Sequence, residues 1–167
     1  LFLESSIQIL LVGDNRQATF STNQSAKYKQ FKGSNIVDLF KVWEQEKKCS
    51  LLYETRCFRC NQAICDFADA LYPDMPRTIS ENNENTGHDG IFLIEENHVH
   101  DYIKTFRPTV LRYSSLFKLP GFHAVNFGEC KGLTFERVLI LPHGPIKKYL
   151  ADGKISTVEG SKEKFYV

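Results

Sequence analysis

Three cysteines close together in the sequence are the side chains here best suited to metal or thiol chemistry. Cys57 and Cys60 have the Cys-x-x-Cys spacing and Cys65 follows, a pattern compatible with zinc binding or a redox dithiol. A closed zinc site requires four ligands, and the sequence has neither a second Cys-x-x-Cys pair nor a His-x-x-x-His pair. His98 and His100 begin a predicted helix, so they are expected to point in different directions. We therefore predict no metal site, and reduced, partly buried thiols in a cytoplasmic protein.

Three other segments join polar or glycine residues to apolar runs. Gly13-Asp14-Asn15-Arg16-Gln17 follows the run 7–12, which is predicted to be a buried strand ending at a loop. Phe58-Arg59-Cys60 precedes a predicted helix. Gly128 and Gly132 are expected to allow a sharp bend before the apolar run 138–141, which is typical of a strand covered on both faces.

These segments must be positioned by alternating strands and helices. Helices are predicted over about 35–48, from about 61 to Pro73, and over 96–106, 145–151 and 160–167. Further strands are predicted at 49–53, 90–94, 109–113, 123–127 and 138–141. Such alternation favours right-handed crossovers and a mainly parallel sheet, so the expected fold is a three-layer α/β domain.

Composition excludes some classes of protein. The chain has 167 residues, 42% hydrophobic and 25% charged, which is ordinary for a globular domain, and no apolar run is long enough for a membrane span. The net charge is +1, but it is unevenly distributed. Residues 1–100 carry 10 basic and 14 acidic side chains, whereas residues 101–167 carry 11 and 6. The basic half is compatible with phosphate contacts, and equally with an ordinary solvated surface.

The three segments, in chain order, resemble motifs III, IV and V of the UvrD/Rep family of superfamily 1 DNA helicases. Gly13-Asp14-Asn15-Arg16-Gln17 is similar to that family's Gly-Asp-x-x-Gln, and Phe58-Arg59-Cys60 to its Tyr-Arg-Ser. Cys130-Lys131-Gly132-Leu133-Thr134-Phe135 is similar to its Ser-Lys-Gly-Leu-Glu-Phe. Residues 164–167 resemble the lead-in to motif VI. The resemblance covers nearly the whole chain.

The resemblance implies a motor that holds ATP with Mg²⁺ in a cleft between two RecA-like domains. Residues 1–48 would be the end of the first motor domain, with its last strand, motif III and a linking helix. Residues 49–167 would be most of the second RecA-like domain, truncated before motif VI. Closure of the cleft would drive steps along single-stranded or partly duplex DNA. The implied partners are DNA, ATP, the missing amino-terminal motor domain and, as a further candidate, a nuclease subunit, with no membrane involved.

The same resemblance implies roles for individual residues. Gln17 would sense the γ-phosphate or its attacking water, and Arg59 would stabilise the transferring phosphoryl group. The other implied residues are Gly13, Asp14, Gly132 and Thr134 at the nucleotide, and Phe20, Cys130 and Lys131 at the DNA, with Phe20 as a stacking ring. Structural alternatives stay open: a polar turn for Gln17, the core for Phe20, a surface ion pair for Arg59 and ordinary solvation for Lys131.

Some residues depart from the family pattern, and at those positions the family's residue roles cannot simply be assigned to this chain. Thr134 replaces the usual glutamate of motif V, Gly128 stands where a histidine is frequent, and Thr22 stands where many members have a stacking tryptophan. The 167 residues contain no Gly-x-x-x-x-Gly-Lys-Ser/Thr phosphate loop. The chain alone is therefore predicted not to hydrolyse ATP. The alternative hypothesis is a non-catalytic RecA-like scaffold module of a DNA repair or phage-defence complex.

Overall fold

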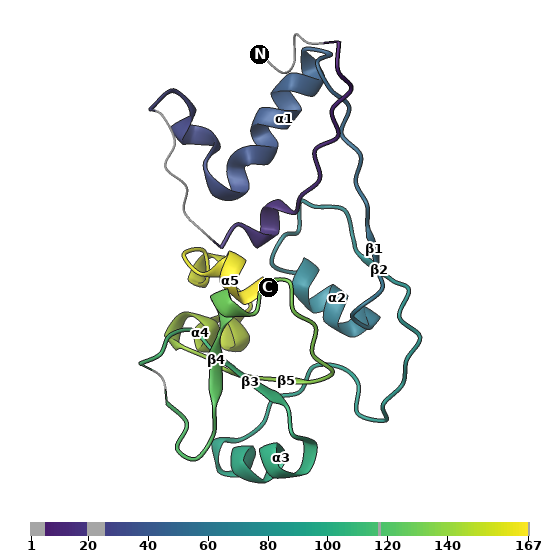
Figure 1. Cartoon of the computed structure of the whole chain (residues 1–167). Coiled ribbons are helices and arrows are strands. Elements are labelled where there is room, and N and C mark those ends of the chain that lie inside the picture. Colours follow the sequence, from purple (N-terminus) through teal and green to yellow (C-terminus); the bar gives the residue numbers. More distant parts are fainter. Residues whose placement is uncertain (1–5, 20–25, 117, 167) are drawn as a thin grey trace. The chain divides into compact units, whose positions relative to one another are not determined.

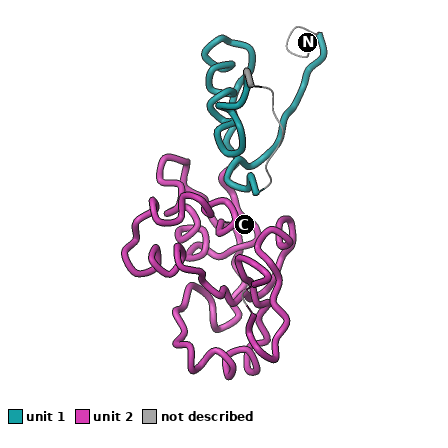
Figure 2. Tube along the Cα trace, turned by 90° about the vertical axis from the view of Figure 1, so that its left-hand side faces the viewer, with its two compact units in different colours: residues 1–54 teal, residues 55–167 magenta. Residues whose placement is uncertain are grey.

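Two compact units make up the chain. The structure, a computed structural model, describes residues 6–19, 26–116 and 118–166. Unit 1 comprises residues 1–54 and unit 2 comprises residues 55–167 (Figure 2). No helix within the described residues is both long and apolar enough to span a membrane.

The apolar run 7–12 of unit 1 differs from its prediction as a buried strand. It is not assigned to any strand, and its side chains are exposed, with Leu10 82% and Val12 89% accessible. A strand requires a neighbour that accepts and donates its backbone hydrogen bonds. Because the described residues of unit 1 form no strand, this run has no sheet to join within the unit, and the prediction of burial is wrong there.

Helix α1, Ile36–Gln45, is the main element of unit 1 and confirms the helix predicted over 35–48. Its apolar residues recur with helical spacing, and the rings of Phe40 and Trp43 meet at 5.5 Å. The preceding turn Gly33–Asn35 is a 3₁₀ helix that leads directly into α1. Two further 3₁₀ helices lie within the described residues of the unit, Asn15–Gln17 and Ala26–Phe31.

Unit 2 begins with a strand–helix–strand element. Strand β1, Arg56–Cys57, pairs in parallel with β2, Ile79–Ser80, and α2, Gln62–Asp69, connects them. The side chain of Asn61 caps α2 by accepting a hydrogen bond from the Ile64 N–H at 3.0 Å. Helix α2 therefore starts immediately after the Cys-x-x-Cys segment, as the sequence predicts.

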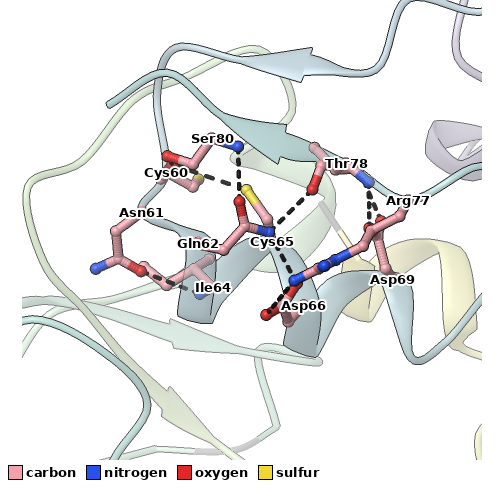
Figure 3. A network of polar contacts seen from close by, with 10 residues as sticks. All are labelled: Cys60, Asn61, Gln62, Ile64, Cys65, Asp66, Asp69, Arg77, Thr78 and Ser80. Carbon is pink, nitrogen blue, oxygen red and sulfur yellow. Dashed lines mark hydrogen bonds and ion pairs between the residues drawn. The ribbon is translucent and has the colours of Figure 1, made fainter. Parts of the chain in front are cut away.

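Polar contacts tie α2 to the β2 segment (Figure 3). The Gln62 Oε1 accepts a hydrogen bond from the Ser80 N–H at 2.9 Å, and Asp69 accepts one from the Thr78 hydroxyl at 2.8 Å. Arg77 forms a bidentate ion pair with Asp66, and its shortest distance is 2.9 Å, from the Arg77 Nη2 to the Asp66 Oδ1. The βαβ element is thus held by side chains as well as by its short ladder.

The second sheet contains three parallel strands in the order β4-β3-β5 (Figure 1). They are β3, Thr109–Arg112, β4, Ala124–Asn126, and β5, Val138–Leu141. In the central strand, Val110 is opposite Ala124 and Leu139, and Leu111 is opposite Val125 and Ile140. All three strands were predicted within one residue of either end.

Helices cover both faces of this sheet because successive strand residues point to opposite sides. Val110 and Ala124 pack with Ile103 of α3, Val99–Phe106, on one side. Leu111 packs on the other side in a cluster with α4, Gly144–Asp152, and residues of α2 and α5, Lys162–Tyr166. The larger cluster contains the fully buried side chains Leu71, Ile146 and Val158.

Two further predicted strands are not formed. Segments 49–53 and 90–94 are outside every strand of the structure. Leu52 is 91% and Leu93 is 78% exposed, so neither segment has the half-buried pleated surface that its apolar pattern predicted. Phe92 instead stacks on the ring of His88 at 4.3 Å. The predicted class is confirmed at a coarser level: the chain is mixed α/β with small parallel sheets.

Candidate functional site

The candidate site of unit 2 lies where two loops leave the carboxyl ends of parallel strands. Arg59 follows β1, and the loop 127–134 follows β4. The Arg59 Nη1 donates a hydrogen bond to the backbone carbonyl of Leu133 at 3.2 Å. Two of the three motif-like segments, 74 residues apart, therefore meet. Carboxyl ends of parallel strands are where α/β proteins generally bind ligands.

Asn82 supports the backbone of Arg59. Its Nδ2 donates to the Arg59 carbonyl at 2.8 Å, and its N–H donates to the Ser80 hydroxyl at 3.1 Å. The Ser80 hydroxyl in turn donates to the Cys60 carbonyl at 2.8 Å. The sequence does not single out Asn82, because it lies in the polar run 81–87, which has no apolar periodicity. Its proximity to Arg59 depends on the β1–β2 pairing.

The loop 127–134 bends at one glycine rather than two. Gly132 has a φ of +83°, whereas Gly128 lies in the 3₁₀ helix Phe127–Glu129 without a positive φ. That short helix starts with a capping box between Asn126 and Glu129. The sequence predicted that both glycines make the bend. That prediction is wrong for Gly128, and Gly132 alone makes the bend.

The predicted DNA-contacting residues of this loop differ in exposure. Lys131, Gly132 and Thr134 are exposed, whereas the Cys130 side chain is only 3% accessible and donates to the Asn126 carbonyl at 3.4 Å. Burial, with the nearby Glu129 carboxylate, raises the pKa of the Cys130 thiol. A contact of this loop with a ligand would accordingly come from its exposed part. The DNA role stays a prediction.

A cavity of about 790 Å³ in unit 2 includes Arg59 and Thr134 in its lining. It runs along the residues of β5 and is also bordered by Asn61, Asn82 and Lys147. Its size is within the usual range of small-molecule sites. Arg59 and Lys147 add positive charge and Asn61 and Asn82 add amide groups, but the lining as a whole balances Arg59, Lys118, Arg137 and Lys147 with Glu84, Asp89, Glu96 and Glu136. The groups that could contact a phosphate are therefore local to Arg59 and Lys147 and are not a property of the whole cavity.

Asp14 organises the third segment, in unit 1. It caps the 3₁₀ helix Asn15–Gln17 and accepts hydrogen bonds from the Arg16 Nε at 2.9 Å and the Gln17 Nε2 at 3.0 Å. Gln17 is therefore held by the aspartate that precedes it. Gly13 is exposed and has no positive φ. The predicted stacking residue Phe20 lies outside the described residues.

The contacts of Asp14 lower its pKa. Burial alone would raise the pKa of this carboxyl group, but hydrogen bonds and charge from Arg16, with a hydrogen bond from Gln17, bring the pKa below its ordinary value. A lowered pKa means that the ionised carboxylate binds its partners better in the folded state than in the unfolded state. This contribution to stability is present above the unfolded pKa and is lost as the pH falls through the folded pKa.

We expect Asp14→Asn to destabilise unit 1 by about 1 kcal/mol at pH 7, because the amide lacks the charge that binds Arg16. The difference between variant and parent should shrink below about pH 4, where the parent carboxylate becomes protonated. The single tryptophan, Trp43, is in α1 of the same unit, so urea unfolding followed by its fluorescence is the measurement. A difference between variant and parent that stays constant from pH 7 to pH 2.5 or so would contradict this assignment.

Among the residues that the structure describes, no group of three or more His, Cys, Asp and Glu side chains is arranged to hold a metal ion. Searches against protein-family models, curated proteins and solved structures found no match for this chain.

Proposed function

We propose that this chain is the carboxyl-side portion of a UvrD/Rep-type ATP-dependent DNA helicase or translocase. The observation that carries the proposal is the hydrogen bond from Arg59 to the Leu133 carbonyl at 3.2 Å. It joins the segment similar to motif IV to the segment similar to motif V. Both would have to border the same nucleotide in a motor of this class. Arg59 and Thr134 also line the same cavity.

The fold of unit 2 supports the finer part of the proposal, a three-layer RecA-like domain. Its strands are parallel, and helices pack on both faces of the β4-β3-β5 sheet. Parallel sheets covered on both faces are typical of nucleotide-binding α/β folds. In this proposal, residues 49–167 belong to the second motor domain.

The apolar run 7–12 supports the proposed place of unit 1. Leu10 and Val12 are largely exposed, and a run of this composition gains stability when other strands cover it. In the proposed protein, strands of the amino-terminal motor domain would pair with this run and complete a sheet. Gln17 would then stand at the end of a strand, with its amide directed by Asp14.

Arg59 would act on ATP through charge and shape. The guanidinium group is planar, permanently charged and has five N–H donors, which suits the oxygens of a transferring γ-phosphoryl group. Gln17 would orient the attacking water, and Lys131 and Gly132 would contact the DNA backbone. ATP with Mg²⁺ is the substrate, and the residues that hold most of it would belong to the amino-terminal motor domain.

The contact between Arg59 and Leu133 also favours a second candidate function. An arginine that holds a loop through a backbone carbonyl has a structural role that requires no ATP. The chain would then be a non-catalytic RecA-like scaffold in a DNA repair or phage-defence complex. A phosphate-loop lysine encoded upstream in the same gene supports the motor, and its absence supports the scaffold.

An ATPase assay on two proteins tests the proposal. The 167-residue chain alone is expected to show no DNA-stimulated ATP turnover, because it contains no phosphate loop. The full gene product is expected to hydrolyse ATP and to be stimulated by single-stranded DNA. Turnover by the chain alone, or a full product that binds no ATP, would refute the motor.

A further inference from the structure

The Cys-x-x-Cys pair stands at the turn between a strand and a helix in a βαβ element. Cys57 ends β1 and Cys60 is followed by Asn61, the cap of α2, and the helix returns the chain to the parallel strand β2. Cys-x-x-Cys next to such a βαβ pattern is the arrangement of thiol–disulfide redox motifs. All three cysteines of this region are free thiols.

The pair is arranged for mutual contact. The Cys60 N–H donates a hydrogen bond to the Cys57 Sγ at 3.4 Å, which brings the Cys57 sulfur next to residue 60. Burial alone would raise the pKa of Cys57, but the backbone N–H groups of Cys60 and Arg59, with the neighbouring thiols of Cys65 and Cys60, lower it below its ordinary value.

The other two thiols have different surroundings. Cys60 is half-buried, and burial and the nearby Cys57 raise its pKa. Cys65 is 3% accessible, its Sγ donates to the Cys60 carbonyl at 3.7 Å, and burial raises its pKa to about 12. Cys57 is half-buried rather than enclosed, so it is the thiol best placed to meet an oxidant, and Cys60 is the accessible partner.

We propose that Cys57 and Cys60 are a redox-active dithiol that a small-molecule disulfide converts into an intramolecular disulfide. The Cys57 thiolate attacks one sulfur of the small disulfide, forms a mixed disulfide and releases one small thiolate. Cys60 then loses its proton and attacks the Cys57 sulfur, which releases the second small thiol. The protein loses two electrons, the small disulfide gains them, and Cys65 takes no part.

The new bond would close a ring around Phe58 and Arg59. In the reduced chain, the Cys60 carbonyl accepts hydrogen bonds from Ser80 and Cys65, and Asn82 holds the Arg59 carbonyl. The disulfide changes the bonding of the Cys57 sulfur that accepts the Cys60 N–H, so it changes the loop that carries Arg59. An effect on ATP turnover follows if Arg59 acts as proposed above. This consequence rests on the proposed function, whereas the disulfide itself does not.

A thiol count tests the dithiol directly. The full chain is equilibrated in buffers of increasing ratio of oxidised to reduced glutathione, quenched with acid, alkylated under denaturing conditions and weighed by mass spectrometry. The reduced chain has five cysteines to alkylate, and the count is expected to fall by two with no glutathione attached. Trypsin cleaves after Arg59, so the bridge should link peptide 57–59 to peptide 60–77.

Serine variants assign the bridge. Cys65→Ser should still lose two thiols on oxidation, whereas Cys57→Ser and Cys60→Ser should not form the bridge. A count that stays at five in fully oxidised buffer, a lasting glutathione adduct without a bridge, or a bridge from Cys57 to Cys65 would each overturn the proposal. Peptide 60–77 contains both Cys60 and Cys65, so the linked peptides of the unaltered chain are also fragmented in the mass spectrometer. An alkyl group on Cys65 identifies the bridge to Cys60, and one on Cys60 identifies the bridge to Cys65, so the test stays decisive even when a variant fails to fold.

ATP turnover of the full gene product tests the consequence separately. The unaltered protein should lose turnover in oxidised buffer and recover it on reduction. Cys60→Ser has the serine that the family motif has at this position, and it should show equal turnover in both buffers. If the bridge forms without any change in turnover, the dithiol proposal stands but its effect on Arg59 is refuted. Failure of the dithiol proposal and failure of the proposed function therefore give different results.

Discussion

Arg59→Ala in the full gene product is expected to lower the rate of ATP hydrolysis about 10³-fold or more, while binding of single-stranded DNA persists. A guanidinium group that stabilises the transferring phosphoryl group contributes an effect of about this size. Alanine removes both the charge and the planar set of donors. Steady-state hydrolysis with saturating DNA and a fluorescence titration of labelled DNA are the two measurements.

Two control variants separate a catalytic role of Arg59 from a structural one. Arg107→Ala removes an exposed arginine elsewhere in unit 2 and should leave turnover within about twofold. Arg59→Lys keeps the positive charge but loses the planar fork, so its turnover should remain far below that of the parent. Parent-like turnover in Arg59→Ala would exclude a catalytic role. Loss of turnover that is matched by equal loss of stability would instead favour the scaffold, in which Arg59 holds the Leu133 carbonyl.

Ile146→Ala is expected to destabilise unit 2 by about 2–5 kcal/mol, the usual cost of deleting most of a buried aliphatic side chain. Ile146 of α4 has 0% of its surface accessible and packs with Leu71, Tyr149 and Val158. Its removal would leave a cavity where residues of α2, α4 and the β4-β3-β5 sheet meet. The midpoint of urea unfolding, followed by far-ultraviolet circular dichroism, is the measurement, since the single tryptophan is in unit 1.

Lys148→Ala is the matched control for this prediction. It lies on the same helix, is exposed and should change the free energy of unfolding by less than about 0.5 kcal/mol. An Ile146→Ala variant as stable as Lys148→Ala would show that α4 does not form part of the core.

Helices were predicted better than strands, because the signals that specify a helix lie within a few consecutive residues. Helix α1 has its apolar residues at helical spacing, and α2 has Asn61 as a cap, so both signals are contained in a few consecutive residues. A strand is different because its hydrogen bonds go to another segment. The runs 7–12, 49–53 and 90–94 have apolar residues suited to strands but no ladder partner in the structure, and their prediction was wrong.

The cysteines illustrate a limit of counting ligands along the chain. Counting ligands argued against a closed four-ligand zinc site, and the same cysteines were expected to be reduced, partly buried thiols. A dithiol, however, requires only two thiols in contact. The contact of the Cys57 Sγ with the Cys60 N–H appears only after β1 and α2 are folded.

The sequence by itself determined that the chain is mixed α/β, that β3, β4 and β5 are strands, and that Arg59 and Gly132 stand in loops beside them. These properties follow from the spacing of apolar residues and from glycine's access to positive φ, which neighbouring residues control. Only the tertiary structure decided that Arg59 reaches the Leu133 carbonyl, that Asn82 supports it, and that Cys130 turns into the core. Those contacts join residues far apart in the chain, and the packing of the βαβ element and the sheet sets their distances, which no local pattern encodes.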